Sequence, residues 1–545
     1  MMNNSSIYIV LLAVILTSIL AGCSDSFFVR PPQDQLTADN FYATETDLRM
    51  ATAPLYNTVW FDYNDKASFT VGDARAGNMI TTDAGYEQFL LFSITSGNDR
   101  LNEAWRSLYL AISQSNLTIK NIQQKAAGDI SEVAKENAIA EARFMRGYAY
   151  SYLAQLWGAV PILTDPAKLI DQPNVRRNLT EDVYQFAIND FEYAAEHLPT
   201  TDDPGRVTQW SALGMLARLH HARAAFKAQD GGTLDQQDLD TAKEYARQVI
   251  EESGLNLVDN YANLFKLENE NNQESLFALQ WTYEGNTWGV QNTTQAYFAA
   301  EAALTGVGDG WGGGTGVSAW LLQQYNPDDQ RRKATFMLNG DHYPELMQEE
   351  GGYTYEGTGA SGPGSAIKKY IIGRPSDNDG RVGFMRTGIN TYMLRLAEVY
   401  LIYAQAELGN QESTSDSQAL QYFNAVRNRA GLDSKTTITH RDILLEKWKE
   451  LAYEGQNWFQ LVRWHYYEPD AVLQFIDDQE RNMSFEYTQG GDTTYTAPPT
   501  NITAEHSDFN LPYPEADIVQ NPNLMEEPVP YDFLNEEGTN EANKE

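Results

Sequence analysis

Residues 131–158, SEVAKENAIAEARFMRGYAYSYLAQLWG, hold the pattern from which we predict the fold. Apolar side chains recur there at the spacing of one helix face, and two of them are alanines that allow another helix to approach closely. The residues of this face are Ala142, Met145, Ala149, Tyr152 and Leu156. Ser131 is a residue type that caps helix N-termini, and Gly158 is one that ends helices. We predict one amphipathic helix between these two residues.

The same periodicity returns along most of the chain. Helical patterns occupy 44–60, 101–127, 181–199, 207–226 and 239–254, and again 390–409, 415–431 and 439–455. Consecutive amphipathic helices that alternate small and large residues stack in pairs, as tetratricopeptide repeats do. The roughly 34-residue consensus of that repeat is not kept, so the repeats are degenerate. We expect a mostly α protein built from tetratricopeptide-like helix pairs.

Between 255 and 389 the helical periodicity stops. This part has glycine clusters at 308–316 and 356–364, and short β-prone pieces such as ESLFALQWTY (274–283). The chain from 468 onward is similarly irregular. Loops held by a rigid scaffold frequently carry binding residues. We therefore expect a large loop-rich insertion with a few short strands, and we expect functional residues there.

The first 22 residues have the form of a secretory signal peptide. An uncharged, mostly apolar run covers 7–22, which is shorter than the roughly 20 residues of a membrane-spanning helix. Its end, LAGC (20–23), is similar to a bacterial lipobox, in which the cysteine thiol receives a lipid and becomes the new N-terminus. Two or more acyl chains anchor a protein stably, at about 0.8 kcal/mol per buried CH₂. We predict lipidation at Cys23, followed by a linker that reaches residue 43.

Charge and cysteine content exclude several classes of protein. The 545 residues include 75 acidic and 39 basic side chains, and the net charge of −36 repels nucleic acid. Cys23 is the only cysteine, so the chain has no internal disulfide and no cysteine-based metal cage. No apolar run of similar length follows the first, so we expect no helix of the mature chain to cross a membrane.

Motifs for cofactors and catalysis are incomplete. Gly308, Gly310 and Gly313 have the spacing of a dinucleotide loop, but no apolar strand precedes them. PSDNDGRVG (375–383) begins like a calcium loop, yet Arg381 stands at its fifth position, which excludes an EF-hand and leaves an unrelated structural calcium site open. HExxH and GxSxG motifs are absent. We expect no enzyme and no cofactor, with a paired-carboxylate glycosidase as an alternative.

Aromatic side chains make up 12% of the chain, and some lie between glycines and polar residues, where a core role is less automatic. Flat rings beside polar groups suit sugars, which stack their C–H faces on the rings and direct hydroxyls to the polar groups. The rings in such contexts are Trp281, Tyr283, Trp288, Tyr297, Trp311, Tyr353 and Tyr355.

Eight segments, in order along the chain, resemble the SusD/RagB family. They are AEARFMRGYAYSYLAQLWGAVPIL (140–163), GRVTQWSALGMLARLHHARAAF (205–226), GWG (310–312), PDDQRRKATF (327–336), YMLRLAEVYLIYAQAELG (392–409), AVRNRAGL (425–432), ELAYEGQNWFQLVRW (450–464) and LPYPEADIVQNPNL (511–524). The chain departs from the family pattern at Glu446-Lys447-Trp448, where ERR is usual, and at Asn457 and Gln460, where Arg and Asp are common. These departures affect the expected local packing and leave the expected fold unchanged.

The resemblance implies a right-handed helical scaffold without catalysis. Family members are outward-facing lipoproteins of the outer membrane that cover a SusC-like TonB-dependent transporter as a hinged lid and deliver oligosaccharides to it. On this basis the chain divides into an N-terminal helical region (44–254), a loop-rich lobe (255–389) and a C-terminal region (390–545). Some members capture peptides instead of glycans. A secreted glycosidase and a purely structural adaptor are two further hypotheses.

Binding residues vary between family members and lie in loops near the start of the chain and in the central insertion. By that placement we predict that the ligand site contains Asp73, Arg75, Asn78, Trp281, Tyr283 and Trp288. Because GWG recurs across the family, the resemblance implies a structural role for Trp311.

Overall fold

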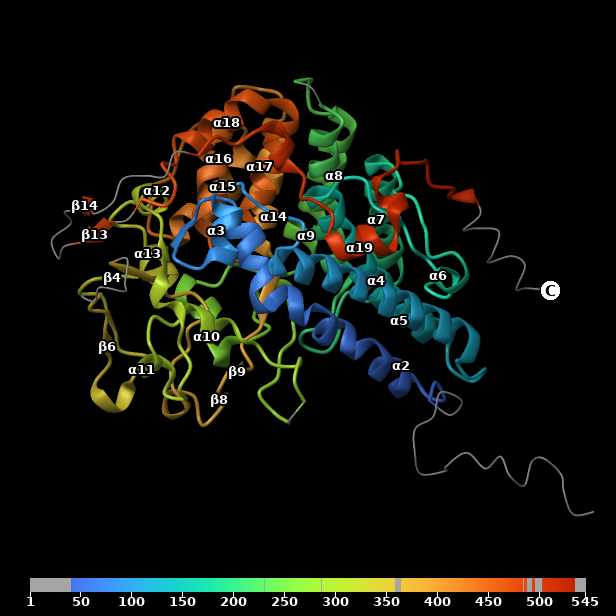
Figure 1. Cartoon of the computed structure of the whole chain (residues 1–545), viewed down its shortest axis with the longest axis horizontal. Coiled ribbons are helices and arrows are strands. Elements are labelled where there is room, and N and C mark those ends of the chain that lie inside the picture. Colours follow the sequence, from blue (N-terminus) through green and yellow to red (C-terminus); the bar gives the residue numbers. More distant parts are fainter. Residues whose placement is uncertain are drawn as a thin grey trace, which may run out of the picture.

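The computed structural model describes residues 41–229, 231–285, 287–357, 364–483, 485–487, 493–495 and 502–534. The predicted signal peptide, Cys23 and most of the linker lie outside these residues. α-Helices dominate, and the strands are two to five residues long. The prediction of a mostly α protein with a few short strands is confirmed (Figure 1).

Helices of the first half pack against their neighbours in the chain. They are α2 (Glu45–Thr52), α3 (Ala84–Leu90), α4 (Asp99–Lys125), α5 (Glu132–Leu156), α6 (Lys168–Asp171), α7 (Thr180–His197), α8 (Gln209–Phe226) and α9 (Gln236–Glu252). α4 packs on α5, α5 on α7, α7 on α8 and α8 on α9. This serial order is the one expected of stacked helix pairs.

α5 begins and ends as its sequence predicts. The Ser131 hydroxyl accepts a hydrogen bond from the Ala134 N–H at 3.3 Å, and Gly158 adopts a φ of +73° after the last turn. The buried surface is wider than the single face that the amphipathic pattern predicts, because from Ala138 to Leu156 every residue except Arg143 is buried. α2, α4, α7, α8 and α17 (Asn457–Tyr467) all contact α5, so it is a central helix rather than a surface one.

The helix predicted over 44–60 is divided into three pieces. α2 is capped by the Thr44 side chain, and it ends at Thr52. Pro54 stands in the first turn of the 3₁₀ helix η2 (Ala53–Tyr56), and η3 (Thr58–Trp60) follows. Because proline has no N–H and its ring clashes with the preceding turn, the α-helical ladder of α2 cannot continue through residue 54.

Helices of the C-terminal half complete the core. They are α14 (Leu396–Leu408), α15 (Ser417–Arg429), α16 (His440–Leu451), α17, α18 (Pro469–Asp477) and α19 (Glu515–Gln520). α14 packs on α8 and α9 from the first half and on α15 and α16 from the second. One hydrophobic cluster therefore contains residues from both halves of the chain.

Short antiparallel strand pairs shape the insertion and its borders. They are β1 (Met79–Thr81) with β3 (Thr315–Val317), β2 (Ser275–Leu279) with β10 (Thr391–Arg395), β4 (Phe336–Leu338) with β7 (Ser365–Ile367), β5 (His342–Tyr343) with β6 (Tyr353–Thr354), β8 (Val382–Gly383) with β9 (Arg386–Thr387), β11 (Ser413–Thr414) with β12 (Ile438–Thr439), and β13 (Phe485–Tyr487) with β14 (Thr493–Tyr495). β10 runs directly into α14, so its pairing with β2 fixes the insertion to the helical core.

Single-turn helices fill the rest of the insertion and the chain ends. The α-helical ones are α10 (Thr294–Phe298), α11 (Ala302–Thr305), α12 (Ala319–Gln324) and α13 (Arg331–Thr335). The 3₁₀ helices are η6 (Tyr261–Phe265), η7 (Leu267–Asn269), η8 (Gly312–Gly314), η9 (Gln348–Glu350), η10 (Pro375–Asp377), η11 (His506–Phe509) and η12 (Pro522–Met525).

Two consecutive π-helical segments lie between α2 and α3. They are η4 (Tyr63–Ala67) and η5 (Thr70–Ala74). η4 contacts both α4 and α10, so it connects the helical core to the insertion. η5 approaches the loop after α16 so closely that a Cβ on Gly72 would lie 2.1 Å from the Gly455 carbonyl oxygen. π-Helices are rare and occur frequently at functional sites.

The residues at which the second half of the chain departs from the family pattern lie in the core. The Lys447 ammonium is fully buried 3.3 Å from a Glu398 carboxylate oxygen. The Trp448 indole N–H donates to the Asn78 Oδ1 at 2.5 Å, and the Asn457 Nδ2 donates to the Trp448 carbonyl at 3.1 Å. Local packing therefore accommodates these departures from the family pattern. The fold is the one that we expected.

Candidate functional site

Asp73 and Asn78 lie in the interior rather than at a surface. The buried Asp73 carboxylate accepts hydrogen bonds from the Tyr453 N–H (2.7 Å), the Gly455 N–H (2.8 Å) and the Asn78 Nδ2 (2.7 Å). Asn78 is itself held by the Trp448 indole. These bonds fix the end of η5 to the loop after α16. We therefore correct the prediction that Asp73 and Asn78 contact a ligand, because their polar atoms are used within the core.

Arg75 is buried as well. Its guanidinium lies 4.4 Å from the centre of the Trp458 ring, and its Nη2 donates to the Asp508 carbonyl. Burial lowers the pKa of Arg75 to about 9, because a low-polarity environment disfavours the charged form. The ligand role predicted for Arg75 is corrected because its side chain is covered and its Nη2 bond ties the end of η5 to η11.

Trp281 is a core residue that follows β2. Its ring is 6% exposed, and its indole N–H donates to the Thr391 hydroxyl at 3.1 Å. The ring also meets Phe61 edge to face, with centroids 6.3 Å apart. A sugar cannot stack on a covered ring, so the prediction for Trp281 is corrected too.

Trp288 lies at the surface, as a ligand-binding residue must. Its side chain is 55% exposed and meets Phe61 edge to face, with ring centroids 5.5 Å apart. Tyr283 is partly buried beside the β8–β9 hairpin, where a Cβ on Gly383 would lie 3.3 Å from its ring. A ligand role for these two aromatic residues stays a prediction that their positions allow.

Trp311 and Phe384 form a second exposed group that was not in the predicted ligand set. They are 50% and 56% exposed, and their rings meet edge to face with centroids 5.8 Å apart. Tyr297 of α10 packs on Trp311 at 5.5 Å. The structural role that the family resemblance implied for Trp311 stays a prediction, and the exposure of its ring also allows a ligand role. We did not predict an exposed ring at Phe384, because in the sequence only its position between Gly383 and a turn distinguishes it from other aromatic residues.

The glycine after Trp311 explains why the ring points outward. The Trp311 N–H donates to the Ala296 carbonyl, and the Gly312 N–H donates to the Ala299 carbonyl, both at 2.8 Å. A Cβ on Gly312 would lie 2.3 Å from the Phe298 carbonyl oxygen. The backbone of this loop is thus pressed against α10, and the indole is left on the solvent side. Within GWG, Gly312 is the residue that this close backbone contact requires, and the Trp311 side chain lies on the solvent side.

Asp309 holds the Trp311 loop against the β8–β9 hairpin. Its buried carboxylate accepts a hydrogen bond from the Met385 N–H at 2.5 Å, and its carbonyl accepts one from the Thr305 hydroxyl at 2.9 Å. Met385 has a φ of +50°, a conformation that non-glycine residues adopt only when surrounding contacts enforce it. This bond therefore fixes Phe384 beside Trp311.

The segment around η4 connects the two exposed groups. Phe61, just before η4, contacts Trp288, and the Lys66 ammonium on η4 lies 4.8 Å from the centre of the Tyr297 ring. Phe61 and Lys66, which are five residues apart in the chain, thus connect two groups of partly or largely exposed rings. We call this set the aromatic strip: Trp288, Phe61, Tyr297, Trp311 and Phe384.

Charged side chains of α4 and of the chain at 62–66 form oppositely charged pairs near the aromatic strip. The pairs are Arg106–Asp62 at 2.8 Å, Arg100–Glu103 at 2.9 Å and Lys66–Asp65 at 3.5 Å. Since each of these cations has an acidic partner, the pairs offer hydrogen-bond donors and acceptors with little net charge. Such pairs can serve the hydroxyls of an uncharged ligand.

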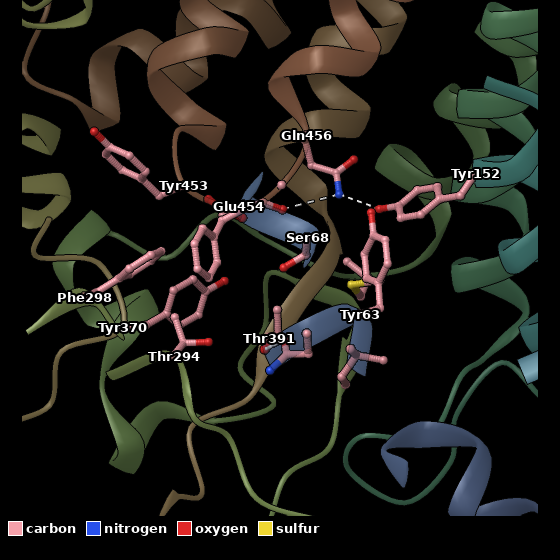
Figure 2. Close-up of a pocket in the computed structure, with 15 residues that line it drawn as sticks. Tyr63, Ser68, Tyr152, Thr294, Phe298, Tyr370, Thr391, Tyr453, Glu454 and Gln456 are labelled. Atoms are coloured by element: carbon pink, nitrogen blue, oxygen red, sulfur yellow. Dashed lines mark hydrogen bonds between the residues drawn. The ribbon is translucent and has the colours of Figure 1, made fainter. Parts of the chain in front are cut away.

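A small cavity lies behind the aromatic strip. It has a volume of about 20 Å³, which is room for one water molecule and too little for a sugar ring. The Gln456 Nε2 donates to the Tyr152 hydroxyl at 2.7 Å beside it (Figure 2). The side chains around it include Tyr63 of η4 and Thr294 and Phe298 of α10. The inner faces of η4 and α10 thus meet at this cavity, while their outer faces carry the aromatic strip.

Metal-ligating side chains do not gather in threes within the described residues. No group of three or more His, Cys, Asp and Glu side chains there is arranged as metal ligands are. In the segment 375–383, the Asp377 carboxylate accepts N–H bonds from Met347 and Arg374, both at 2.9 Å, and Asp379 is exposed 3.6 Å from Arg381. A calcium site in this segment stays a prediction.

Comparisons with known proteins place this helical scaffold and its exposed rings in a family. The model of the SusD family matches residues 195–529, and a model described as starch-binding, associating with the outer membrane, matches residues 33–220. The chain belongs to the SusD family. In the part of the chain that the structure describes, no helix has the length and apolarity needed to span a bilayer.

Individual relatives support this membership. A SusD-like protein of Bacteroides ovatus is 42% identical over 546 residues, which cover 96% of this chain and 98% of the relative. A solved structure described with xylogluco-oligosaccharide is 42% identical, with a TM-score of 0.82 over 89% of this chain and 99% of that one. A laminarin-binding SusD-like protein, 21% identical with a TM-score of 0.66, shares the fold over 88% of this chain and 98% of its own.

Proposed function

We propose that the aromatic strip binds an oligosaccharide by stacking and breaks no bonds. The observation that carries this proposal is the exposure of Trp288, Trp311 and Phe384 in two groups of rings that the chain from Phe61 to Lys66 connects. Contiguous exposed apolar surface on a soluble domain usually marks a binding site. Paired polar side chains near the strip supply the hydrogen bonds that a sugar needs.

Ring stacking sets the expected strength of binding. Each ring contact contributes about 0.5–1.5 kcal/mol beyond area burial. A few such contacts, less the cost of ordering the ligand, give a Kd of about micromolar to millimolar. This range suits a protein that captures a ligand and then passes it on.

We propose a xyloglucan-type oligosaccharide as the ligand. The relative whose solved structure is described with xylogluco-oligosaccharide is 42% identical to this chain. The ion pairs near the aromatic strip leave little unpaired charge, which favours an uncharged glycan. The net charge of −36 acts against polyanionic polysaccharides such as alginate.

Isothermal titration of the soluble chain from residue 24 onward tests this proposal. We expect saturable binding of xyloglucan oligosaccharides, and none of alginate fragments or of a peptide mixture. A Trp288→Ala/Trp311→Ala double variant should lose binding, while Val133→Ala, which changes an exposed apolar residue of α5, should retain it. Binding of peptides alone would favour peptide capture instead. Sugar release by the purified protein, abolished by one Asp or Glu substitution, would favour a glycosidase.

We further propose that Cys23 carries a lipid anchor in the outer membrane and that the protein delivers its ligand to a SusC-like TonB-dependent transporter as its lid. Family membership and the LAGC motif at 20–23 support this proposal. Purification of the tagged chain from detergent-solubilised outer membranes should recover such a transporter. Cys23→Ser should move the chain out of the membrane fraction; an unchanged distribution would exclude the anchor.

A further inference from the structure

A groove formed by α17, α18 and η11 lies away from the aromatic strip. It has a volume of about 390 Å³. In Figure 1, α17 and α18 lie at the top of the molecule, whereas α10, β8 and β9 lie near the bottom. Its lining residues include Gln229, His465, Tyr466, His506, Phe509 and Asn510.

Two histidines face each other in this groove. The Nε2 of His465 on α17 is 3.1 Å from the Nδ1 of His506 on η11. His465 stacks on Phe509, with centroids 3.8 Å apart and ring planes 12° apart, so its ring is oriented by packing. The other nitrogen of His506, Nε2, lies 3.7 Å from the Asp470 carboxylate. This distance is too long for a hydrogen bond, so the His465 contact is the hydrogen bond that the His506 ring makes here.

We propose that His465 and His506 bind one late first-row divalent metal ion, such as Zn²⁺, Ni²⁺ or Cu²⁺, between these facing nitrogens. Two nitrogen ligands of a tetrahedral zinc ion, with bonds of about 2.0–2.1 Å, lie about 3.3–3.4 Å from each other. The facing nitrogens therefore need to separate by a few tenths of an ångström and to turn their lone pairs toward a common point. Water, or the side-chain amide oxygens of Gln229 and Asn510 in the groove, fills the remaining positions.

The two facing groups are of a ligand type that suits these metals. Imidazole nitrogen is a preferred ligand of zinc, nickel and copper. Without metal, the same contact is a hydrogen bond in which the N–H of one imidazole donates to the ring nitrogen of the other.

An ion at this position would join α17 to the segment around η11. That segment is packed on the core, because Phe509 stacks on Trp458 with centroids 5.1 Å apart, and the Leu511 N–H donates to the Leu156 carbonyl at 2.7 Å. The two histidines are 41 residues apart in the chain, so only the folded protein holds them together. A ligand that binds the folded state alone raises its stability. The site stands independently of the proposed glycan binding.

Metal titration of the untagged chain from residue 24 onward tests the inference. With ZnCl₂, NiCl₂ and CuCl₂ we expect binding of one ion per chain by calorimetry and a Tm that rises with metal concentration. His506→Ala should weaken binding by roughly tenfold or more, since even an outer partner of a ligand is worth about 10–100-fold. His506 is exposed, so this variant should fold. His197→Ala is the matched control, because His197 stacks on Tyr193 of α7 outside the groove.

A spectroscopic experiment identifies the side chains that bind the metal ion. The electron paramagnetic resonance spectrum of bound Cu²⁺ should show hyperfine splitting from two nitrogens in the wild type and from fewer in His465→Gln. Equal metal affinity in the wild type and His506→Ala, or no saturable binding in the wild type, would overturn the inference and leave a hydrogen bond between the two imidazoles. Unchanged xyloglucan affinity in His506→Ala should accompany the loss of metal binding, which separates this site from the aromatic strip.

Discussion

Trp281 and Trp311 have the same side chain in opposite environments. Trp281 is covered and donates to Thr391, whereas half of Trp311 faces solvent. We expect Trp281→Ala to lower the free energy of unfolding by about 3–5 kcal/mol. Trp311→Ala should change it by about 0.5 kcal/mol or less and weaken xyloglucan binding about two- to tenfold. Urea unfolding and calorimetry measure both quantities, and equal destabilisation by the two variants would contradict the assignment.

Asp73 tests the conclusion that the early loop is structural. Its carboxylate accepts three N–H groups, and an asparagine would direct an NH₂ group at one of them. We expect Asp73→Asn to lower the free energy of unfolding by about 1–3 kcal/mol. Glycan affinity should stay unchanged. Asp379→Asn, at an exposed acid, is the matched control and should alter neither quantity. A loss of affinity without a loss of stability would restore Asp73 to the ligand site.

The loop that carries Trp311 is the element on which the aromatic strip depends. We expect Gly312→Ala to weaken glycan binding although no ring is removed, because its Cβ would lie 2.3 Å from the Phe298 carbonyl and the loop must shift. The same strain should lower stability by about 1–3 kcal/mol. Gly128→Ala is the matched control, since a Cβ there meets nothing within 4 Å. Wild-type affinity of Gly312→Ala in calorimetry would show that the loop position is immaterial.

At the element scale, η4 is the part that a periodicity analysis cannot anticipate. Helical periodicity predicted residues 44–60 as one helix and gave no indication of π-helical turns at 63–67. These turns place Lys66 over Tyr297 while Tyr63 faces the interior cavity. The insertion strands were expected only in general terms, because each is two to five residues long and is stabilised by a partner far away in the chain.

The whole molecule is joined by a buried ionic network centred on Arg395. Its guanidinium contacts Glu274 at 2.6 Å, Glu450 at 2.9 Å and Glu454 at 2.7 Å, and all four groups are buried. We expect Arg395→Met to lower the free energy of unfolding by about 3–5 kcal/mol, because it leaves buried carboxylates without this partner. Arg247→Met, which removes exposed pairs on α9, should cost about 1 kcal/mol or less. Equal losses of unfolding free energy in Arg395→Met and Arg247→Met, measured by urea unfolding, would show that the buried network does not join the molecule.

Acid should unfold the protein partly through Glu398. Burial alone would raise the pKa of this carboxyl, but the charges of Arg218 and Lys447 lower it to about 2. The same carboxyl has a pKa of about 4.3 in the unfolded chain. Between these two pKa values the folded state therefore binds fewer protons than the unfolded state. The stability from Glu398 is therefore complete above about pH 5 and is lost as pH falls toward 2. Urea unfolding from pH 6 to 2 should show a smaller pH dependence in Glu398→Gln than in the wild type.

The sequence by itself determined most of the long helices, because periodic apolar residues and capping residues act locally: α5 begins after Ser131 and ends before Gly158 as predicted. The family segments added the expected overall fold. Tertiary structure alone decided which aromatic residues are displayed. Trp281 and Trp288 are seven residues apart in similar loop sequence, yet β10 covers the first and solvent reaches the second. Exposure depends on what packs over a residue from distant parts of the chain, and no local pattern records that.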